Sequence, residues 1–245
     1  MKVSLFATCI VDQIHPQIGE AMVILFRRLG VAVTFNPAQT CCGQPAFNAG
    51  YRNEARQVAE RCLEVLASEL ETSDYVVVPS GSCTAMARKF YWELFADDPA
   101  RQAIAERVAE RVFELSEFIV KVLGIEDVGA RFRGHVTYHD SCHLLRELGV
   151  SDPPRRLLKS IEGVELLELE GADVCCGFGG LFAVKHPEIS TAIAMDKARN
   201  IESSEADTLV ACDAGCLMQI AGLIKRNGST IRCLHLAEML IRQET

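Results

Sequence analysis

Apolar residues along the chain form two kinds of segment that alternate from one end to the other. Short continuous runs, rich in β-branched residues, are typical of strands buried on both faces of a sheet. Longer stretches with apolar residues three and four positions apart are typical of amphipathic helices. The expected strands are Lys2–Ala7, Val31–Phe35, Asp74–Val78, His135–Tyr138, Val164–Leu169 and Asp207–Ala211. The expected helices are Pro16–Leu29, Tyr51–Leu70, one beginning near Ser82, Pro153–Ser160, Pro187–Ser203 and Gly215–Arg226.

A pattern of four cysteines occurs twice in the chain. Each copy contains an adjacent cysteine pair followed by glycine, and the offsets between the copies are 133, 134 and 133 residues. Such agreement over long spacings indicates an internal duplication. The first set is Cys9, Cys41, Cys42 and Cys83, and the second set is Cys142, Cys175, Cys176 and Cys216.

The duplication and the alternation of strand and helix together predict the fold. We expect an α/β protein of two homologous Rossmann-like halves, 1–130 and 131–245, with mostly parallel sheets and a pseudo-two-fold repeat. The segment Val112–Ile119 resembles Cys233–Leu240 at the shorter offset of 121 residues. The first copy is therefore longer, which predicts an added helix near residues 97–111.

Each repeated cysteine lies just past the carboxyl end of an expected strand or at the start of the next helix. In α/β sheets these ends converge on a common crevice where ligands bind. Each half is therefore expected to assemble four thiols at one edge of its sheet. Four thiolates suit either tetrahedral zinc or an iron–sulfur cluster.

The adjacent cysteine pair favours iron–sulfur over zinc. Structural zinc usually takes ligands two to four residues apart, whereas neighbouring cysteines on an extended segment point apart and better fit a larger object. Gly43 and Gly177, directly after the pairs, supply the backbone freedom that a close approach needs. We expect at most one iron–sulfur cluster per half, with the 4Fe-4S type favoured and zinc as the alternative.

Composition limits the cellular setting and the class of partner. The chain has 245 residues, eleven cysteines and a formal net charge of −8. The acidic balance argues against nucleic acid as a partner, and no apolar run is long enough for a membrane span. Without a secretory segment the protein is expected to be cytoplasmic, where a disulfide framework is not favoured. Cys62 and Cys233 are expected to be core thiols.

The repeated pattern resembles a known domain. It is similar to the CCG cysteine-rich domain that occurs in heterodisulfide reductase and in the iron–sulfur subunit of glycolate oxidase. The free-standing form with two copies resembles the lactate utilization protein A family. Two further stretches carry the resemblance, Tyr138–Leu144 and Cys175–Gly180.

The resemblance implies an iron–sulfur electron-transfer subunit of a complex that oxidises L-lactate to pyruvate. Its partners would be other subunits of that complex, such as iron–sulfur or flavin proteins. No catalytic residue is identified, and the isolated chain is not expected to oxidise the substrate. The alternatives are a thiol–disulfide reductase similar to the CCG-containing subunit of heterodisulfide reductase, a glycolate oxidase iron–sulfur subunit, and a zinc-stabilised interaction module without redox activity.

The sequence departs from heterodisulfide reductase at the end of each motif. In that relative a Cys-x-x-Cys ending supplies a fifth thiolate to a non-cubane cluster, but here Ser80 and Asp213 stand three residues before Cys83 and Cys216. A cubane with four thiolates or an oxygen ligand fits equally well, and Cys212 is a possible substitute ligand. His139 and His143 flank Cys142, where they can orient a ligand, carry a proton or hydrogen-bond locally.

Overall fold

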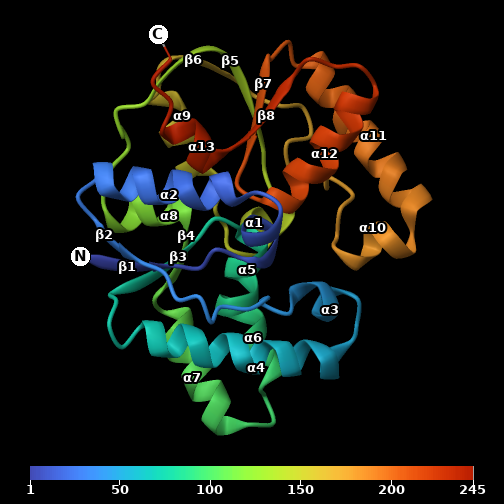
Figure 1. Cartoon of the computed structure of the whole chain (residues 1–245). Coiled ribbons are helices and arrows are strands. Elements are labelled where there is room, and N and C mark those ends of the chain that lie inside the picture. Colours follow the sequence, from blue (N-terminus) through green and yellow to red (C-terminus); the bar gives the residue numbers. More distant parts are fainter. Residues whose placement is uncertain (245) are drawn as a thin grey trace.

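The computed structural model describes residues 1–244, which contain two four-stranded sheets (Figure 1). Every strand pair in both sheets is parallel. The strands are β1 (Lys2–Leu5), β2 (Ala32–Thr34), β3 (Tyr75–Val78), β4 (Val112–Glu114), β5 (Arg131–His139), β6 (Glu162–Leu167), β7 (Thr208–Ala211) and β8 (Arg232–His235).

The two sheets have the same strand order. The first is β2-β1-β3-β4 and the second is β6-β5-β7-β8, so each strand of the first sheet has its equivalent four strands later. Parallel strands need crossover connections, and helices provide them in both halves. The predicted α/β fold with parallel sheets and an internal repeat is confirmed.

The helices of the first half alternate with its strands. They are α1 (Cys9–Gln13), α2 (Pro16–Arg28), α3 (Gln44–Asn48), α4 (Arg52–Glu69), α5 (Gly81–Ala85), the π-helix η1 (Met86–Phe90), α6 (Tyr91–Leu94), α7 (Pro99–Ala109), α8 (Leu115–Glu117) and the π-helix η2 (Phe118–Val122). The second half follows the same plan. Its helices are the π-helix η3 (His143–Glu147), α9 (Asp152–Lys159), α10 (Leu181–Lys185), α11 (Pro187–Ser203), α12 (Ala214–Arg226) and α13 (Leu236–Leu240). Among residues 1–244, no helix is both long and apolar enough to cross a membrane.

The expected strands and long helices are present, and most of their ends lie within two residues of the prediction. Helix α11 has the predicted bounds, whereas β5 begins at Arg131, four residues earlier than expected. Strands β4 and β8 are not among the expected elements. Each is three or four residues long and occupies the outer edge of its sheet. Neither therefore produces an apolar run long enough to predict a strand.

The halves pack against each other reciprocally. Helix α13 of the second half contacts α2 of the first, and α8 and η2 of the first half contact α9 of the second. Figure 1 shows α2 and α13 side by side between the two sheets. Because α2 is equivalent to α9, and α13 to the α8–η2 segment, these contacts are related by the pseudo-two-fold repeat.

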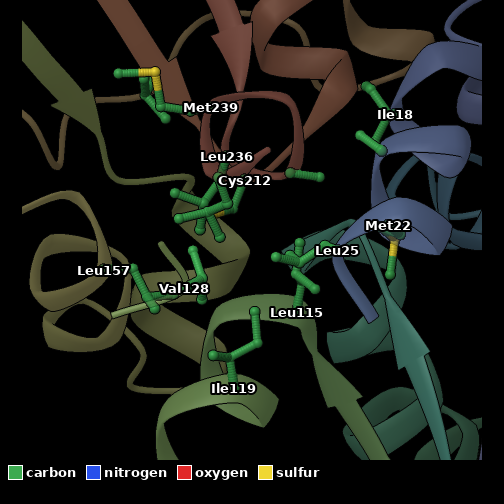
Figure 2. Close-up of a cluster of buried hydrophobic side chains, with 14 of the residues drawn as sticks. Ile18, Met22, Leu25, Leu115, Ile119, Val128, Leu157, Cys212, Leu236 and Met239 are labelled. Carbon is green, nitrogen blue, oxygen red and sulfur yellow. The ribbon is translucent and has the colours of Figure 1, made fainter. Parts of the chain in front are cut away.

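One hydrophobic cluster extends across the boundary between the halves. Figure 2 shows Leu25 of α2 and Leu115 of α8 facing the cluster that contains Cys212 and Leu236 of the second half. All four side chains are fully buried. Since burial of each such side chain contributes about 1.5–3 kcal/mol, the two halves form one structural unit.

Helix α7 belongs to the first half alone. Asp98 caps its start by accepting from the Arg101 amide, and Pro99 occupies its first turn. The helix packs against α4, away from the second half (Figure 1). In the second half, α12 is followed by β8 after the short segment 227–231.

Candidate metal centre

A cavity at the boundary between the halves brings the two cysteine sets together. It encloses about 870 Å³, including the part that opens to solvent, and its walls come from both halves. Cys41 does not line this cavity but a neighbouring one that it shares with Cys9, and its Sγ lies 3.7 Å from that of Cys9. The other seven thiols that line the cavity are Cys9, Cys42, Cys83, Cys142, Cys175, Cys176 and Cys216.

The four thiols of the first set lie in two close pairs. The Sγ atoms of Cys9 and Cys41 are 3.7 Å apart, and those of Cys42 and Cys83 are 3.4 Å apart. Cys9 begins α1 directly after β1, and Cys83 lies in the first turn of α5 after β3. The Cys41–Cys42 pair comes from the loop after β2, so all four follow the carboxyl ends of neighbouring strands, as predicted.

The second set has the same arrangement and an additional side chain. The thiols of Cys142 and Cys175 lie close enough to shift each other's pKa, as do those of Cys176 and Cys216. A ring nitrogen of His139 and the Sγ atoms of Cys176 and Cys216 all lie within 4.8 Å of one another. This is the spacing of side chains that can share one metal centre.

The glycine after each cysteine pair has a structural role that is the same in both halves. Gly43 and Gly177 both have φ of +85°, which disfavours any residue with a Cβ. Their amides donate to the sulfurs of Cys41 and Cys175, at 3.5 and 3.3 Å. A Cβ at Gly177 would lie 2.4 Å from the carbonyl oxygen of Ser190, so the helix behind the loop excludes a larger residue.

Contacts among the thiols favour the ionised form of one cysteine in each adjacent pair. The pKa of Cys41 is lowered to about 3, chiefly by the hydrogen bond with Cys42 and then by that with Cys9. The pKa of Cys175 is lowered to about 2 by Cys142 and then Cys176. The thiolate is the form that binds metal, so the lowered pKa values favour the ligand form of Cys41 and Cys175.

Ser80 and Asp213 lie on the cavity wall and bind each other. The Ser80 hydroxyl donates to Asp213 Oδ2 at 3.1 Å, and the Ser82 amide donates to the same oxygen at 3.0 Å. The other carboxylate oxygen accepts from the Gly215 amide at 3.2 Å. Each carboxylate oxygen of Asp213 is thus engaged by protein donors at the start of α5 and α12.

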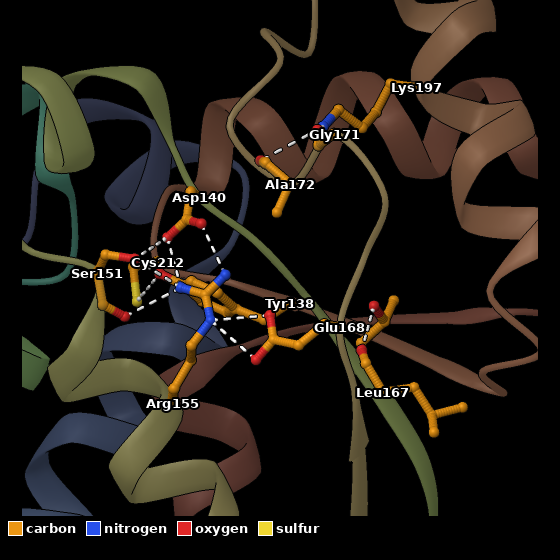
Figure 3. A network of polar contacts seen from close by, with 11 residues as sticks. Tyr138, Asp140, Ser151, Arg155, Leu167, Glu168, Gly171, Ala172, Lys197 and Cys212 are labelled. Atoms are coloured by element: carbon orange, nitrogen blue, oxygen red, sulfur yellow. Dashed lines mark hydrogen bonds and ion pairs between the residues drawn. The ribbon is translucent and has the colours of Figure 1, made fainter.

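The three cysteines outside the repeated sets lie elsewhere. Cys212 is fully buried in the core of Figure 2, where it accepts a hydrogen bond from the Tyr138 hydroxyl at 3.4 Å (Figure 3). It is not among the residues that line the cavity. Cys62 is buried on α4, and Cys233 is partly buried on β8. Burial raises the pKa of both Cys62 and Cys233 to about 12, as expected for inert thiols.

The two histidines that flank Cys142 have different surroundings. His143 lines the cavity, and its Nδ1 lies 3.6 Å from the sulfur of Cys142. Its Nε2 lies 3.2 Å from the side-chain amide nitrogen of Gln44 in the other half. His139 is fully buried, and neither ring nitrogen has a hydrogen-bond partner in the described chain. Burial lowers the pKa of His139 to about 3, so the ring is neutral at physiological pH.

Sequence reasoning does not single out Lys197 on α11. Its side chain is fully buried, and Nζ donates to the carbonyl oxygens of Gly171 and Ala172 (Figure 3). A lysine on an amphipathic helix is normally exposed, but this one shares the buried face of α11 with Ala194 and Ile201. A further signal is its register with Cys62, because the two residues follow their cysteine pairs at nearly the same distance.

The donor set fits a thiolate-bound metal centre. Two sets of four sulfurs, each with amide donors nearby, are the kind of environment that holds a soft metal or an iron–sulfur cluster. The buried, unpartnered imidazole of His139 beside the second set is an orphaned polar group that a bound metal centre would satisfy. The residues present therefore fit the group that the motif implies.

Comparison with known proteins agrees with this site. The family model described as "Cysteine-rich domain" (CCG) matches residues 3–88 and 136–221. The chain is therefore a protein with two CCG cysteine-rich domains. It is 49% identical over 240 residues to lactate utilization protein A of Geobacillus kaustophilus, covering 98% of each chain. It is 46% identical over 244 residues to that of Shouchella clausii, covering the whole of both. The chain belongs to the lactate utilization protein A family.

One solved structure shares the fold at low sequence similarity. The crystal structure of a hypothetical protein from Helicobacter pylori matches 99% of this chain and 49% of its own, with a TM-score of 0.59. Sequence identity between the two is 11%. The likeness therefore concerns the arrangement of the elements alone.

Proposed function

We propose that this protein is an iron–sulfur electron-transfer subunit of a complex that oxidises L-lactate to pyruvate. The observation that carries the proposal is that seven of the eight repeated thiols, drawn from both sets, line one cavity between the halves. The relatives' name, lactate utilization protein A, supplies the substrate. The proposal joins the chemistry of the donor set to the family to which the chain belongs.

The residues that would hold the clusters are the two repeated cysteine sets. A bound cluster would supply one-electron transfer at a potential set by its protein surroundings. The chain itself provides the thiolates, the amides of Gly43 and Gly177 beside them, and an apolar wall that includes Pro45 and Phe178.

Oxidation of lactate itself is assigned to a partner protein of the complex. A 2-hydroxy acid carries a carboxylate, which proteins usually bind with arginine or lysine. The described residues that line the cavity include neither, and Asp213 adds a negative charge to the wall. The cavity therefore suits electron transfer better than binding of an anionic substrate.

The contacts of Ser80 and Asp213 in the cavity wall argue against the thiol–disulfide reductase alternative. That chemistry, in heterodisulfide reductase, is linked to a cluster with a fifth thiolate from the Cys-x-x-Cys ending. At the equivalent positions Ser80 and Asp213 are engaged with each other and with backbone amides. An electron-transfer role with four thiolates per site requires no fifth ligand.

Reduction by lactate tests the proposal. The chain, loaded with clusters under anaerobic conditions, is mixed with L-lactate alone and then with its partner proteins present. We expect the cluster absorption to bleach only in the complete mixture, and more rapidly with L-lactate than with D-lactate or glycolate. Bleaching by glycolate alone would reassign the substrate, and no bleaching in an active complex would contradict the electron-transfer role.

A further inference from the structure

Two equivalent positions directly behind the thiols differ between the halves. Phe6 and His139 each stand three residues before the first cysteine of their set. The carbonyl oxygens of Ala55 and Ser190 close the space beside Gly43 and Gly177. Cys62 and Lys197 each lie seven residues further along these two helices. The four side chains are therefore two matched pairs within one duplicated framework.

The first half fills both positions with apolar groups. Phe6 and Cys62 are each 1% exposed and belong to the same hydrophobic cluster as Cys42 and Cys83. Neither side chain brings a charge to the back of the first thiol set. Phe6 also has no hydrogen-bond donor to offer to a sulfur.

The second half fills the same positions with polar groups close to the thiols. His139 has a ring nitrogen within 4.8 Å of the sulfurs of Cys176 and Cys216, and its two ring nitrogens have no partner among the described residues. A neutral imidazole carries one N–H. Four thiolates already provide the ligands of a cubane, so this N–H is free to donate to a sulfur.

Lys197 adds a positive charge behind the same set. It is fully buried, and its Nζ donates to two backbone carbonyl oxygens (Figure 3). Burial lowers the pKa of Lys197, and the nearby sulfurs of Cys176 and Cys216 oppose that shift. The carboxylate of Asp173 is nearby but exposed. In a buried environment of low dielectric constant, a fixed cation acts on an adjacent metal centre more strongly than one in water does.

We infer that the two metal sites are electronically inequivalent, and that Lys197 and His139 give the cluster of the second half the higher reduction potential. The inference rests on the proposed function. A cluster that accepts an electron becomes more negative, and a cation or an N–H donor beside its sulfurs stabilises that state. When one electron passes between the clusters, the first-half cluster is oxidised by one electron and the second-half cluster is reduced by one. At equilibrium, electrons therefore reside mainly on the second-half cluster.

Redox titration followed by EPR tests the inference on the full chain. The variants are Lys197→Met, which removes the charge at similar volume, and His139→Phe, which installs the residue of the first half. Each is expected to lower the higher of the two potentials and leave the lower one unchanged. His139→Gln, which keeps an N–H donor, should recover part of the shift. Lys225→Met removes an exposed charge from α12 and should shift neither potential.

Iron and sulfide analysis of every variant separates the possible failures. Variants that keep the wild-type iron content but show unmoved potentials would overturn the inference and leave the proposed function standing. A fall in both reduction potentials would also overturn it, because the two residues would then not act on the second-half cluster alone. A wild-type chain that binds no cluster would overturn the proposed function and this inference with it.

Discussion

Ser80 and Asp213 occupy equivalent positions in the two halves and hydrogen-bond to each other across the boundary between them. Their backbones also form an isolated antiparallel bridge. Each side chain caps the helix that carries the last cysteine of its set, since Ser80 accepts from the Cys83 amide and Asp213 from the Gly215 amide. One contact thus fixes the starts of α5 and α12 relative to each other.

Loss of this contact should weaken the fold while leaving the metal centre loaded. Asp213→Ala removes a carboxylate that accepts from Ser80, Ser82 and Gly215, and we expect the free energy of unfolding to fall by about 2–4 kcal/mol. Asp213→Asn, which keeps an acceptor for the cap, should cost less. Urea denaturation measures both, and Asp196→Ala on the exposed face of α11 is the control. A change in the cluster's EPR spectrum in Asp213→Asn would instead identify Asp213 as a ligand.

The glycine that follows the second cysteine pair should be irreplaceable. In Gly177→Ala the new Cβ meets the Ser190 carbonyl oxygen at 2.4 Å in a left-handed conformation, so the loop must move. We expect a loss of about 1–3 kcal/mol and loss of metal from the second half only. Gly222→Ala on α12 is the matched control, because no atom of residues 1–244 lies within 4 Å of the added Cβ. That variant should be stabilised by about 0.5–1 kcal/mol. Equal stability and equal metal content in the two variants would contradict the role given to Gly177.

Glu114 and His235 are equivalent residues that face the opposite half. The carboxylate of Glu114 interacts with the thiol of Cys212, and His235 Nε2 donates to the Pro79 carbonyl oxygen at 3.1 Å. Burial raises the pKa of Glu114 to about 7 and lowers that of His235 to about 4. For both residues, therefore, the fold favours the neutral form.

The pKa of Glu114 predicts a pH-dependent stability difference. Because it is raised from 4.5 in the unfolded chain to about 7, its contribution is complete below pH 4.5 and is lost as the pH rises through 7. Glu114→Gln cannot ionise, so its stability relative to wild type should increase between these pH values by up to about 3 kcal/mol. Denaturation of both proteins at a series of pH values measures the difference. A difference that is constant with pH would contradict the buried, neutral carboxyl.

Cys212 should contribute to the core and not to the metal centre. Cys212→Ala removes a fully buried sulfur that accepts from the Tyr138 hydroxyl, and we expect destabilisation of about 1–2 kcal/mol. The iron content per chain should be unchanged. Loss of iron from this variant would restore Cys212 as the substitute ligand that its position beside Asp213 suggests.

Much of this architecture follows from the sequence because the duplication presents the same pattern twice. The spacing of the cysteines predicts both sets at strand ends, and the structure brings each set together there. The meeting of both sets in one cavity does not follow, because it depends on how α2 and α13 pack between the halves. Local patterns contain no information on that contact.

The residues that distinguish the two sites are harder to recognise for a related reason. His139 is recognisable as a neighbour of Cys142, but nothing in its local sequence indicates that its ring is buried without partners. Lys197 stands among apolar residues on the buried face of α11. Periodicity alone does not show that one polar residue on such a face is itself buried. Only alignment of the two halves, with Phe6 and Cys62 as the counterparts, shows that both are substitutions at the back of a thiol set.

Two equivalent sets of four thiolates are proposed to hold one iron–sulfur cluster each. Iron, acid-labile sulfide and zinc, measured per chain after anaerobic purification, test this proposal in wild type, Cys42→Ala, Cys176→Ala and the control Cys233→Ala. We expect roughly eight iron and eight sulfide in wild type and the control for two four-iron clusters, half of that in each single-site variant, and no zinc. Stoichiometric zinc without iron, or the same iron content in all four proteins, would contradict the account.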